Sequence, residues 1–475
     1  MKILELLLGI FLFSNILIAE PIAQNNIYKT SPEQNKIDKS NFFRKAPYIL
    51  YAGKNTKMLI LWQLNTTKNC TLSWGTDSNY TTGSISSSEY GNDHQHKYLL
   101  QSLIPNTKYY FKVEVDNQNI RKGNFRSGAA DNDKKISFYA YGDTRSNPSK
   151  HNLVAQAIMT SIAQDSLSQT FIVSSGDFVS NGNNESDWDN QFFAPQYTSI
   201  QKMLSSLPYL ASMGNHEGQG ILYDKYFPFP MYTTNRYYYS FDYGPVHFTV
   251  IDQFTNYSNG SAQYNWIVND LASTNKEWKI ILLHEPGWSA GGHYNNYTVQ
   301  NVIQPLCINY GVQFVITGHN HYYARALVNG VEHITTGGGG APLYNPHANA
   351  QNIVKTDKSY HFCKIDIDHD TLHFSAIRAN GSLIETFDYH RTPNSINLNL
   401  AKTVKSIKIY SFDKNIVIDN PQNHHGNIEI YNLTGNIIYT KELSSGKQKI
   451  LIPNGGIYFV RVTVGNTFFV DKLLL

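Results

Sequence analysis

The chain has 475 residues, which is enough for about three domains of ordinary size. Hydrophobic residues make up 41% of the sequence and charged residues only 16%, and the net charge is +3 at pH 7. Charge therefore gives no support for a nucleic-acid partner or a membrane surface, because both depend on clustered basic residues.

Three cysteines, Cys70, Cys307 and Cys363, lie far apart in the sequence. An odd number at such spacing is not a disulfide framework. We expect each to be buried as a small apolar side chain. Cys70 and Cys363 could pair only if two domains met there.

The first 19 residues have the pattern of a secretory signal peptide. Lys2 precedes a short apolar run, and the small residue Ala19 closes it. A membrane anchor is the alternative, but Glu5 and Ser14-Asn15 interrupt the run, which is shorter than the ~20 apolar residues of a span. No other segment is apolar enough to cross a bilayer.

Residues 20–43 are polar and without periodicity, which predicts a flexible leader. Residues 44–128 then alternate short apolar runs, such as residues 58–62 and 109–113, with turn residues. Short strands at regular spacing predict a β-sandwich. Trp62, residues 103–109 and residues 123–125 make this segment resemble a fibronectin type III-like domain, such as the N-terminal domain of purple acid phosphatases.

Residues 134–392 have a different hydrophobic pattern, in which apolar strands alternate with segments of helical spacing. This alternation predicts an α/β layered domain. The expected strands are residues 136–141, 171–173, 209–213, 246–251, 278–283 and 312–317, and the expected helices are residues 149–164, 188–204, 263–273 and 299–310. Strand and hairpin signals follow Gly318. Residues 394–475 form a separate all-β module without a catalytic cluster.

Polar side chains follow five of the predicted strands of residues 134–392, at the point where each strand ends. Ligands of open α/β sheets bind outside the carboxyl ends of strands, so these side chains should converge. They are Asp143, Asp177, Asn215, His284, and the pair His319 and His321. Carboxylate, amide oxygen and imidazole together suit divalent and trivalent transition ions. Two such ions can clamp the attacking and leaving oxygens of a displacement at phosphorus.

This ordered set resembles the calcineurin-like metallophosphoesterase superfamily and, with the sandwich in front of it, the purple acid phosphatase branch. The resemblance implies a four-layer α-β-β-α catalytic fold holding two metal ions, either Fe, Zn, Mn or Mg. It implies that Asp177 bridges the ions. One ion would then take Asp143 and His321, and the other Asn215, His284 and His319.

Two positions depart from the family. Ser180 stands where purple enzymes have the tyrosine that colours ferric iron, and Arg145 stands where the wider superfamily has a histidine. Arginine has no lone pair for a metal. We therefore expect a colourless enzyme whose first ion binds weakly, or with help from water or Ser180. Arg145 fits better as a phosphate clamp, because guanidinium matches phosphate oxygens; a surface ion pair is the alternative.

Two histidines are candidates to protonate the leaving group, since imidazole titrates near neutral pH. His216 follows Asn215, and it could instead orient the metal ligands. His293 lies in the loop after His284, where the family places such a histidine; an exposed loop residue is the alternative. Ala324 replaces the acidic residue that the family usually has between Tyr323 and Arg325, which puts that local network in doubt.

The C-terminal module resembles the type IX secretion sorting domain in its strands and in the segments 432–436 and 454–462. The resemblance implies contact with the secretion machinery and a secreted or cell-surface protein; an ordinary adhesive sandwich is the alternative.

The whole pattern predicts a secreted phosphomonoesterase that uses a metal-bound hydroxide on small phosphate esters. A phosphodiesterase or nucleotide pyrophosphatase on the same core, and a surface adhesion protein with a degenerate site, remain alternatives.

Overall fold

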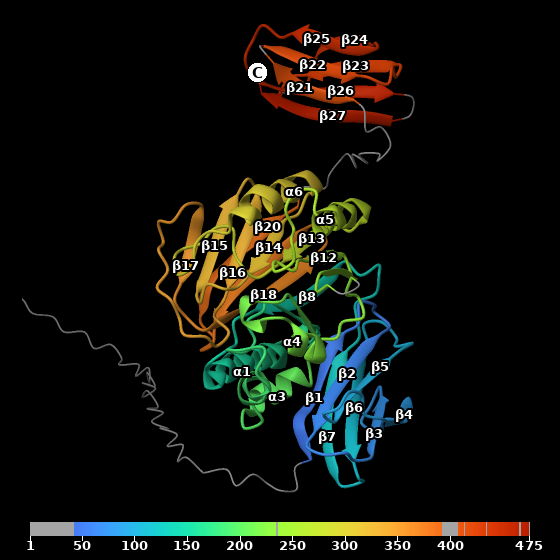
Figure 1. Ribbon diagram of the computed structural model, residues 1–475, viewed down its shortest axis with the longest axis vertical. Helices are drawn as coiled ribbons and strands as arrows, with labels where there is room; N and C mark the ends of the chain where they lie inside the picture. Colours follow the sequence, from blue (N-terminus) through green and yellow to red (C-terminus); the bar gives the residue numbers. More distant parts are fainter. Residues whose placement is uncertain are drawn as a thin grey trace, which may run out of the picture. The chain divides into compact units, whose positions relative to one another are not determined.

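The computed structural model describes residues 42–233, 236–391, 407–412, 414–433, 435–464 and 467–474. The chain divides into two compact units, Met1–Arg391 and Thr392–Leu475 (Figure 1). The predicted signal peptide and nearly all of the predicted leader lie outside the described residues. Among those that are described, no helix is long and apolar enough to cross a membrane.

The first unit begins with a sandwich of two antiparallel sheets. One sheet has the order β1-β2-β5 and the other β4-β3-β6-β7. Side chains of β6 alternate between buried and half-buried, as expected when one face of a strand covers a core. The strands are β1 Phe43–Tyr51, β2 Met58–Leu64, β3 Cys70–Gly75, β4 Gly83–Ser87, β5 Gln95–Leu100, β6 Lys108–Val115 and β7 Asn119–Arg126.

Two larger sheets follow in the same unit. The first has the order β20-β19-β18-β8-β9-β10, and the second β11-β12-β13-β14-β16-β15-β17. The first sheet contains β8 Lys135–Tyr141, β9 Ile172–Ser174, β10 Tyr209–Ala211, β18 His361–Asp368, β19 Thr371–Arg378 and β20 Leu383–His390. The second contains β11 Tyr239–Tyr243, β12 Val246–Val250, β13 Trp278–Leu282, β14 Phe314–Thr317, β15 Tyr323–Val328, β16 Val331–Thr336 and β17 Ile353–Asp357.

The two sheets pack face to face through aromatic side chains. Phe248 of β12 stacks on Phe241 of β11 at 4.7 Å and meets the edge of Phe138 of β8 at 5.4 Å. Helices α1 (Pro148–Gln164) and α3 (Thr198–Leu204) pack with the first sheet, and α5 (Ala262–Ser273) and α6 (Gln304–Tyr310) with the second. Figure 1 shows these helices outside the paired sheets. The predicted four-layer fold is therefore confirmed.

The sandwich is continuous with the first of the two larger sheets. Strand β1 pairs in parallel with β10 through Leu50 and Tyr209, so β1, β2 and β5 complete a nine-stranded sheet. Lys45 of β1 is fully buried, and its Nζ lies 2.9 Å from Glu185 and 2.5 Å from Asp189. The change of sequence pattern near residue 130 therefore separates the β-sandwich segment from the α/β segment, and both segments belong to one compact unit.

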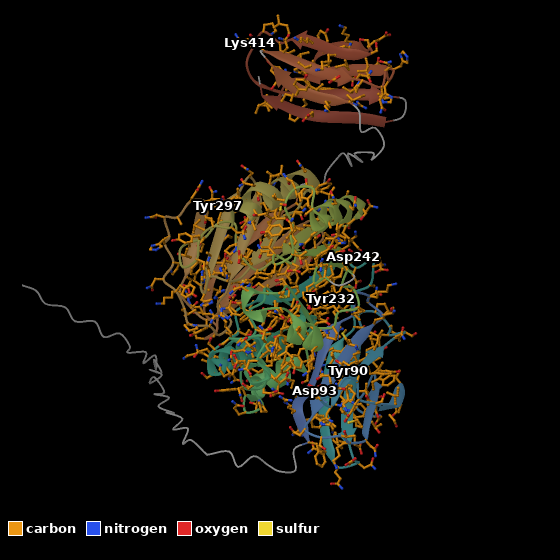
Figure 2. The ribbon with its side chains drawn as sticks, viewed as in Figure 1. Tyr90, Asp93, Tyr232, Asp242, Tyr297 and Lys414 are labelled. Carbon is orange, nitrogen blue, oxygen red and sulfur yellow. The ribbon has the colours of Figure 1, made fainter. Side chains whose placement is uncertain are left out.

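A second ion network crosses the same junction. Lys225 contacts both Asp93, which Figure 2 labels on the sandwich, and Glu185, whose Oε2 lies 3.0 Å from Lys225 Nζ. These side chains are only partly buried, and ion pairs of this kind add little stability. They hold the sandwich in one orientation against the catalytic sheets.

One predicted helix is wrong. Residues 188–204 form a π-helical turn, Trp188–Phe192, and then α3, with a break between them that contains Pro195. Proline lacks the amide hydrogen of a helix interior and disfavours helical geometry in the residue before it. Two short helices that were not predicted also occur, α2 (Glu185–Asp187) and α4 (Ile221–Tyr226).

All three cysteines are buried and free, so the possible pair Cys70–Cys363 does not form.

The described part of the second unit is all β, as predicted, with sheet orders β21-β22-β25 and β24-β23-β26-β27. Its own core contains Ile416, Ile428 and Val460. The strands are β21 Lys408–Phe412, β22 Asn415–Asn420, β23 Gly426–Tyr431, β24 Ile437–Leu443, β25 Gly446–Leu451, β26 Ile457–Val464 and β27 Thr467–Leu474.

Candidate metal centre

The predicted ligands come together at the carboxyl ends of β8, β9, β10, β13 and β14. Nε2 of His284 lies 3.0 Å from Asn215 Oδ1 and 3.3 Å from Asp177 Oδ1. The backbone N–H of His319 donates to both oxygens of Asp143 at 3.0 Å. Residues spread over more than a third of the sequence, from Asp143 to His321, therefore meet in one place.

Three of these residues have backbone conformations that side chains rarely adopt. The φ angles of Asp143, Asp177 and His319 are 58°, 56° and 66°. This left-handed conformation costs about 1 kcal/mol or more for a non-glycine residue and clusters at functional sites. It turns the chain sharply where each strand ends, so that the side chain points back over the sheet edge.

One half of the site consists of Asn215, His284 and His319, called the asparagine group below. His284 Nδ1 donates to the carbonyl of Ser175 at 2.6 Å, so its Nε2 carries a free lone pair. That lone pair faces Asn215 Oδ1 at 3.0 Å, and His319 Nδ1 lies 2.9 Å from the same oxygen. The amide oxygen and the His284 nitrogen are both acceptors with no hydrogen between them, which is an arrangement that a cation stabilises.

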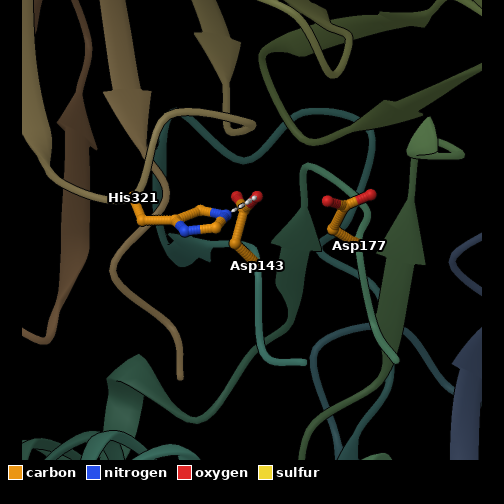
Figure 3. A group of neighbouring side chains, drawn as sticks. All are labelled: Asp143, Asp177 and His321. Carbon is orange, nitrogen blue, oxygen red and sulfur yellow. Dashed lines mark ion pairs between the residues drawn. The ribbon is translucent and has the colours of Figure 1, made fainter. Parts of the chain in front are cut away.

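The other half consists of Asp143, Asp177 and His321, called the aspartate group below (Figure 3). One ligand atom from each lies within 4.8 Å of the others, and His321 Nε2 is 3.6 Å from Asp143 Oδ1. All three side chains are buried. Burial raises the pKa of Asp143, and the neighbouring charge of Asp177 raises it further.

His319 and His321 stay neutral near pH 7, as metal ligands must. Burial lowers the pKa of His321 to about 4 and that of His319 to about 2, with smaller contributions from the positive charges of neighbouring rings and of Arg145. The asparagine group and the aspartate group thus both offer the donor atoms that transition metals bind.

Arg145 points into the aspartate group. Its Nε lies 3.4 Å from Asp177 Oδ2, its Nη2 lies 3.2 Å from His321 Nε2, and its Nη1 lies 3.2 Å from Ser146 Oγ. The side chain is only 15% exposed. Arg145 therefore does pair with a carboxylate, as the alternative expected, but the pair lies inside the site and not on the surface.

Ser180 is engaged elsewhere. Its hydroxyl lies 3.0 Å from Ser146 Oγ and donates to Gln191 Oε1 at 3.0 Å. The same Gln191 oxygen accepts from the backbone N–H of Ser180 and of Ser146. Ser180 thus joins a hydrogen-bond cluster that supports the loop, and nothing in this geometry presents it as a ligand.

Both acid candidates lie beside the ligands. His216 donates from Nδ1 to the carbonyl of Ser180 at 2.7 Å, and its Nε2 lies 3.8 Å from Asp177 Oδ2. His293 is exposed, and its ring centroid lies 4.0 Å from that of His319. Both imidazoles are therefore placed where a substrate above the ligands would meet them.

Sequence reasoning missed Tyr344 and Glu217. The ring of Tyr344 stacks on His321 at 4.2 Å, and its hydroxyl lies 3.4 Å from His293 Nε2. Glu217 is fully buried and accepts from the backbone N–H of Asp177, Phe178 and Gly214 at 2.9, 2.8 and 2.7 Å. Glu217 follows Asn215 by two positions, a signal that the sequence offered.

A substitute also exists for the acidic residue that Ala324 replaces. Glu385, from β20, accepts from the hydroxyl of Tyr323 at 2.6 Å and from Arg325 Nε at 3.0 Å. A carboxylate from a distant strand thus completes the network that the local sequence put in doubt.

Family models match two parts of the chain. Residues 138–323 match the model described as Calcineurin-like phosphoesterase, and residues 412–475 match the Secretion system C-terminal sorting domain. The chain therefore carries a calcineurin-like phosphoesterase domain and a C-terminal sorting domain, which confirms both resemblances.

Within that class the chain's relatives are purple acid phosphatases. It is 30% identical to purple acid phosphatase 18 of Arabidopsis thaliana over 165 residues, which cover 30% of this chain and 38% of the relative. It is also 30% identical to the probable inactive purple acid phosphatase 1 of the same plant over 236 residues, 40% of this chain and 38% of the relative. The matches thus span 38% of the length of these curated relatives.

Solved structures show the same fold. Purple acid phosphatase PPD1 from yellow lupin (Lupinus luteus) seeds superposes with a TM-score of 0.61 at 19% identity, over 73% of this chain and 75% of that one. A structure of PhoD gives a TM-score of 0.55 at 12% identity, over 88% of this chain and 94% of that one.

Proposed function

We propose that this protein is an exported, metal-dependent phosphoesterase that acts chiefly on phosphate monoesters. The observation that carries the proposal is the convergence of Asp177 with the asparagine group, where imidazole nitrogens and an amide oxygen face each other beside a buried carboxylate. The phosphoesterase domain and the purple acid phosphatase relatives support the reaction class.

The residues present fit a metal ion at the asparagine group. Asp177, Asn215, His284 and His319 offer oxygen and nitrogen donors of the kinds that bind Fe, Zn and Mn. Such an ion, when bound, polarises phosphate oxygens and lowers the pKa of a water ligand. The sequence predicts a second ion at the aspartate group, with Asp177 shared between the two.

The protein's own side chains supply positioning and proton transfer. Arg145 has five N–H donors, only some of which are used by His321 and Ser146, so others are available to phosphate oxygens. His293 and His216 lie beside the ligands and are the side chains that we assign to protonate a departing alkoxide. His293 is exposed, which suits a group that meets leaving groups of different sizes.

Asp177→Asn tests the metal-dependent reaction, because this residue contacts both groups. We expect the full chain to hold metal and to hydrolyse p-nitrophenyl phosphate, and the variant to lose bound metal and at least about 100-fold in rate. Asp77→Asn is a matched control, since Asp77 only accepts a turn hydrogen bond from Asn79. An unchanged rate in Asp177→Asn would exclude the proposed site.

The substrate class needs a separate comparison. Wild-type protein should hydrolyse p-nitrophenyl phosphate faster than bis-p-nitrophenyl phosphate. The reverse order would assign a phosphodiesterase on the same core. Hydrolysis of neither ester, with no bound metal, would leave the surface adhesion protein with a degenerate site.

A further inference from the structure

Arg145 occupies space that the family pattern gives to a metal ion. Its Nη2 lies 3.2 Å from His321 Nε2 and its Nε 3.4 Å from Asp177 Oδ2. These two ligand atoms are the ones that a metal ion would bind at about 2.0–2.2 Å. The guanidinium group therefore bridges the same pair of residues from within the aspartate group.

The tautomer of His321 makes this competition specific. Its Nδ1 lies 2.8 Å from the carbonyl oxygen of Pro342, which can only accept, so Nδ1 carries the hydrogen. Its Nε2 then has a single lone pair, and Arg145 Nη2, which can only donate, is directed at it. One lone pair cannot serve an N–H donor and a metal ion together.

The asparagine group differs from the aspartate group in its neighbours. No cationic side chain contacts Asn215 Oδ1 or His284 Nε2 in the described part of the chain; their recorded neighbours are each other, His319 and Asp177. The asparagine group therefore offers its acceptors to a cation from outside the chain, while a guanidinium group already supplies a positive charge in the aspartate group.

Arg145 is held in this position by its surroundings. Nη1 bonds to Ser146, whose backbone N–H donates to Gln191, and the side chain is 15% exposed. An arginine is always charged in a protein, so the positive charge next to Asp143 and Asp177 is permanent.

We propose that the Arg145 guanidinium replaces one of the two metal ions of the family, so that this chain holds a single ion, at Asp177 and the asparagine group. The inference rests on the proposed function in one respect only: it assumes that the side chains of the site are metal ligands. It predicts a centre with one exchangeable ion and one fixed organic cation, both next to Asp177.

Metal stoichiometry of the full-length protein tests the inference. We expect wild type, saturated with Mn²⁺ and desalted, to retain one equivalent with the spectrum of an uncoupled ion. Arg145→His should retain two equivalents that are magnetically coupled, because imidazole replaces the guanidinium group. Arg378→His, at an arginine that pairs with Asp357 away from the site, should behave as wild type.

Two further variants locate the ion. His284→Ala should lose the wild-type equivalent, whereas His321→Ala should keep it, because His321 is already engaged by Arg145. Circular dichroism verifies that each variant is folded. Two equivalents or none in wild type, or one equivalent in Arg145→His, would overturn the inference.

These measurements separate the inference from the proposed function. One equivalent in wild type and two in Arg145→His, without phosphatase activity, would keep the inference and exclude the function. An active wild type that retains two equivalents of Mn²⁺ would keep the proposed function and exclude the inference.

Discussion

Glu217 holds together the loops that carry Asp177 and Asn215. Its carboxylate accepts from three buried backbone N–H groups, those of Asp177, Phe178 and Gly214. Burial raises the pKa of Glu217, the nearby charge of Asp177 adds to the rise, and the three N–H groups oppose it. This residue contributes to function by positioning ligands.

Glu217→Ala should therefore lower the free energy of unfolding by roughly 3 kcal/mol, because buried N–H groups lose their acceptor. Glu217→Gln keeps an acceptor oxygen and should lose less. Urea unfolding followed by tryptophan fluorescence measures the first unit alone, since all six tryptophans precede residue 392. Equal losses in the two variants would contradict the hydrogen-bond explanation.

His247 is the centre of a partly buried ion cluster outside the site. Its Nδ1 donates to Asp242 at 2.7 Å and its Nε2 to Asp270 at 3.0 Å. Burial lowers the pKa of His247, but hydrogen bonds and the charges of both aspartates more than reverse this and raise it to about 9. The charged form is thus favoured in the folded protein.

A raised pKa stabilises the fold below the ordinary histidine value of 6.5, and this stabilisation disappears as the pH rises from 6.5 to about 9. We expect His247→Gln to cost roughly 2 kcal/mol at about pH 6 and much less above about pH 9. Tryptophan-monitored urea unfolding at both pH values measures the difference. His369→Gln, where the side chain is 73% exposed, should cost little at either; a pH-independent loss in His247→Gln would refute the argument.

Turns at the strand ends set the geometry of the site at the scale of elements. Gly318 follows β14, and its N–H donates to the carbonyl of His284 at 2.9 Å. A Cβ atom at Gly318 would lie 2.2 Å from Asp143 Oδ2 and 2.4 Å from Ser175 Oγ. The absence of a side chain lets β14 deliver His319 against Asp143.

Gly318→Ala should displace Asp143 and lower phosphatase activity by about 100-fold, since misplacing ligands by about 1 Å has effects of this size. Steady-state hydrolysis of p-nitrophenyl phosphate measures the loss. Gly330→Ala is the comparison, because no atom lies within 4 Å of its Cβ although its φ is +83°. That variant should lose about 1 kcal/mol of stability and keep its activity; equal losses of activity would remove the steric argument.

The two compact units have separate cores at the scale of the whole molecule. The second unit packs Ile416, Ile428 and Val460 into a cluster of its own. All proposed site residues lie in the first unit. The sorting domain therefore serves export, by our proposal, and adds no side chain to the chemistry.

Removal of residues 392–475 should leave the melting temperature and the activity of the first unit unchanged, and should keep the protein inside the producing cell. Activity in the culture medium and in the cell lysate gives the comparison. Loss of activity per mole in the truncated protein would show that the units depend on each other. Export of the truncated protein would contradict the role of the sorting domain.

Local patterns in the sequence were enough to predict most strands, an α/β layered domain and the six candidate ligands, and the family resemblance added the four-layer arrangement. The reason is that strand periodicity is a local property, and parallel strands place their carboxyl ends at one edge whatever their order. Asp143, Asp177 and Asn215, which follow β8, β9 and β10 of one sheet, could therefore be grouped without knowledge of any contact, whereas the meeting of this sheet with the one that carries His284 depends on tertiary packing. The break at Pro195 had a local signal that outweighed the helical spacing around it.

Only the tertiary structure decided the features that depend on pairs distant in the sequence. The pairing of β1 with β10, the supply of Glu385 to Arg325, and the direction of Arg145 toward His321 all join residues more than 50 positions apart. Such contacts follow from side-chain packing and sheet register, which no local pattern encodes. The sequence by itself determined which residues reach the site, and the tertiary structure decided which lone pair faces a guanidinium group and which is left for the metal ion that we propose.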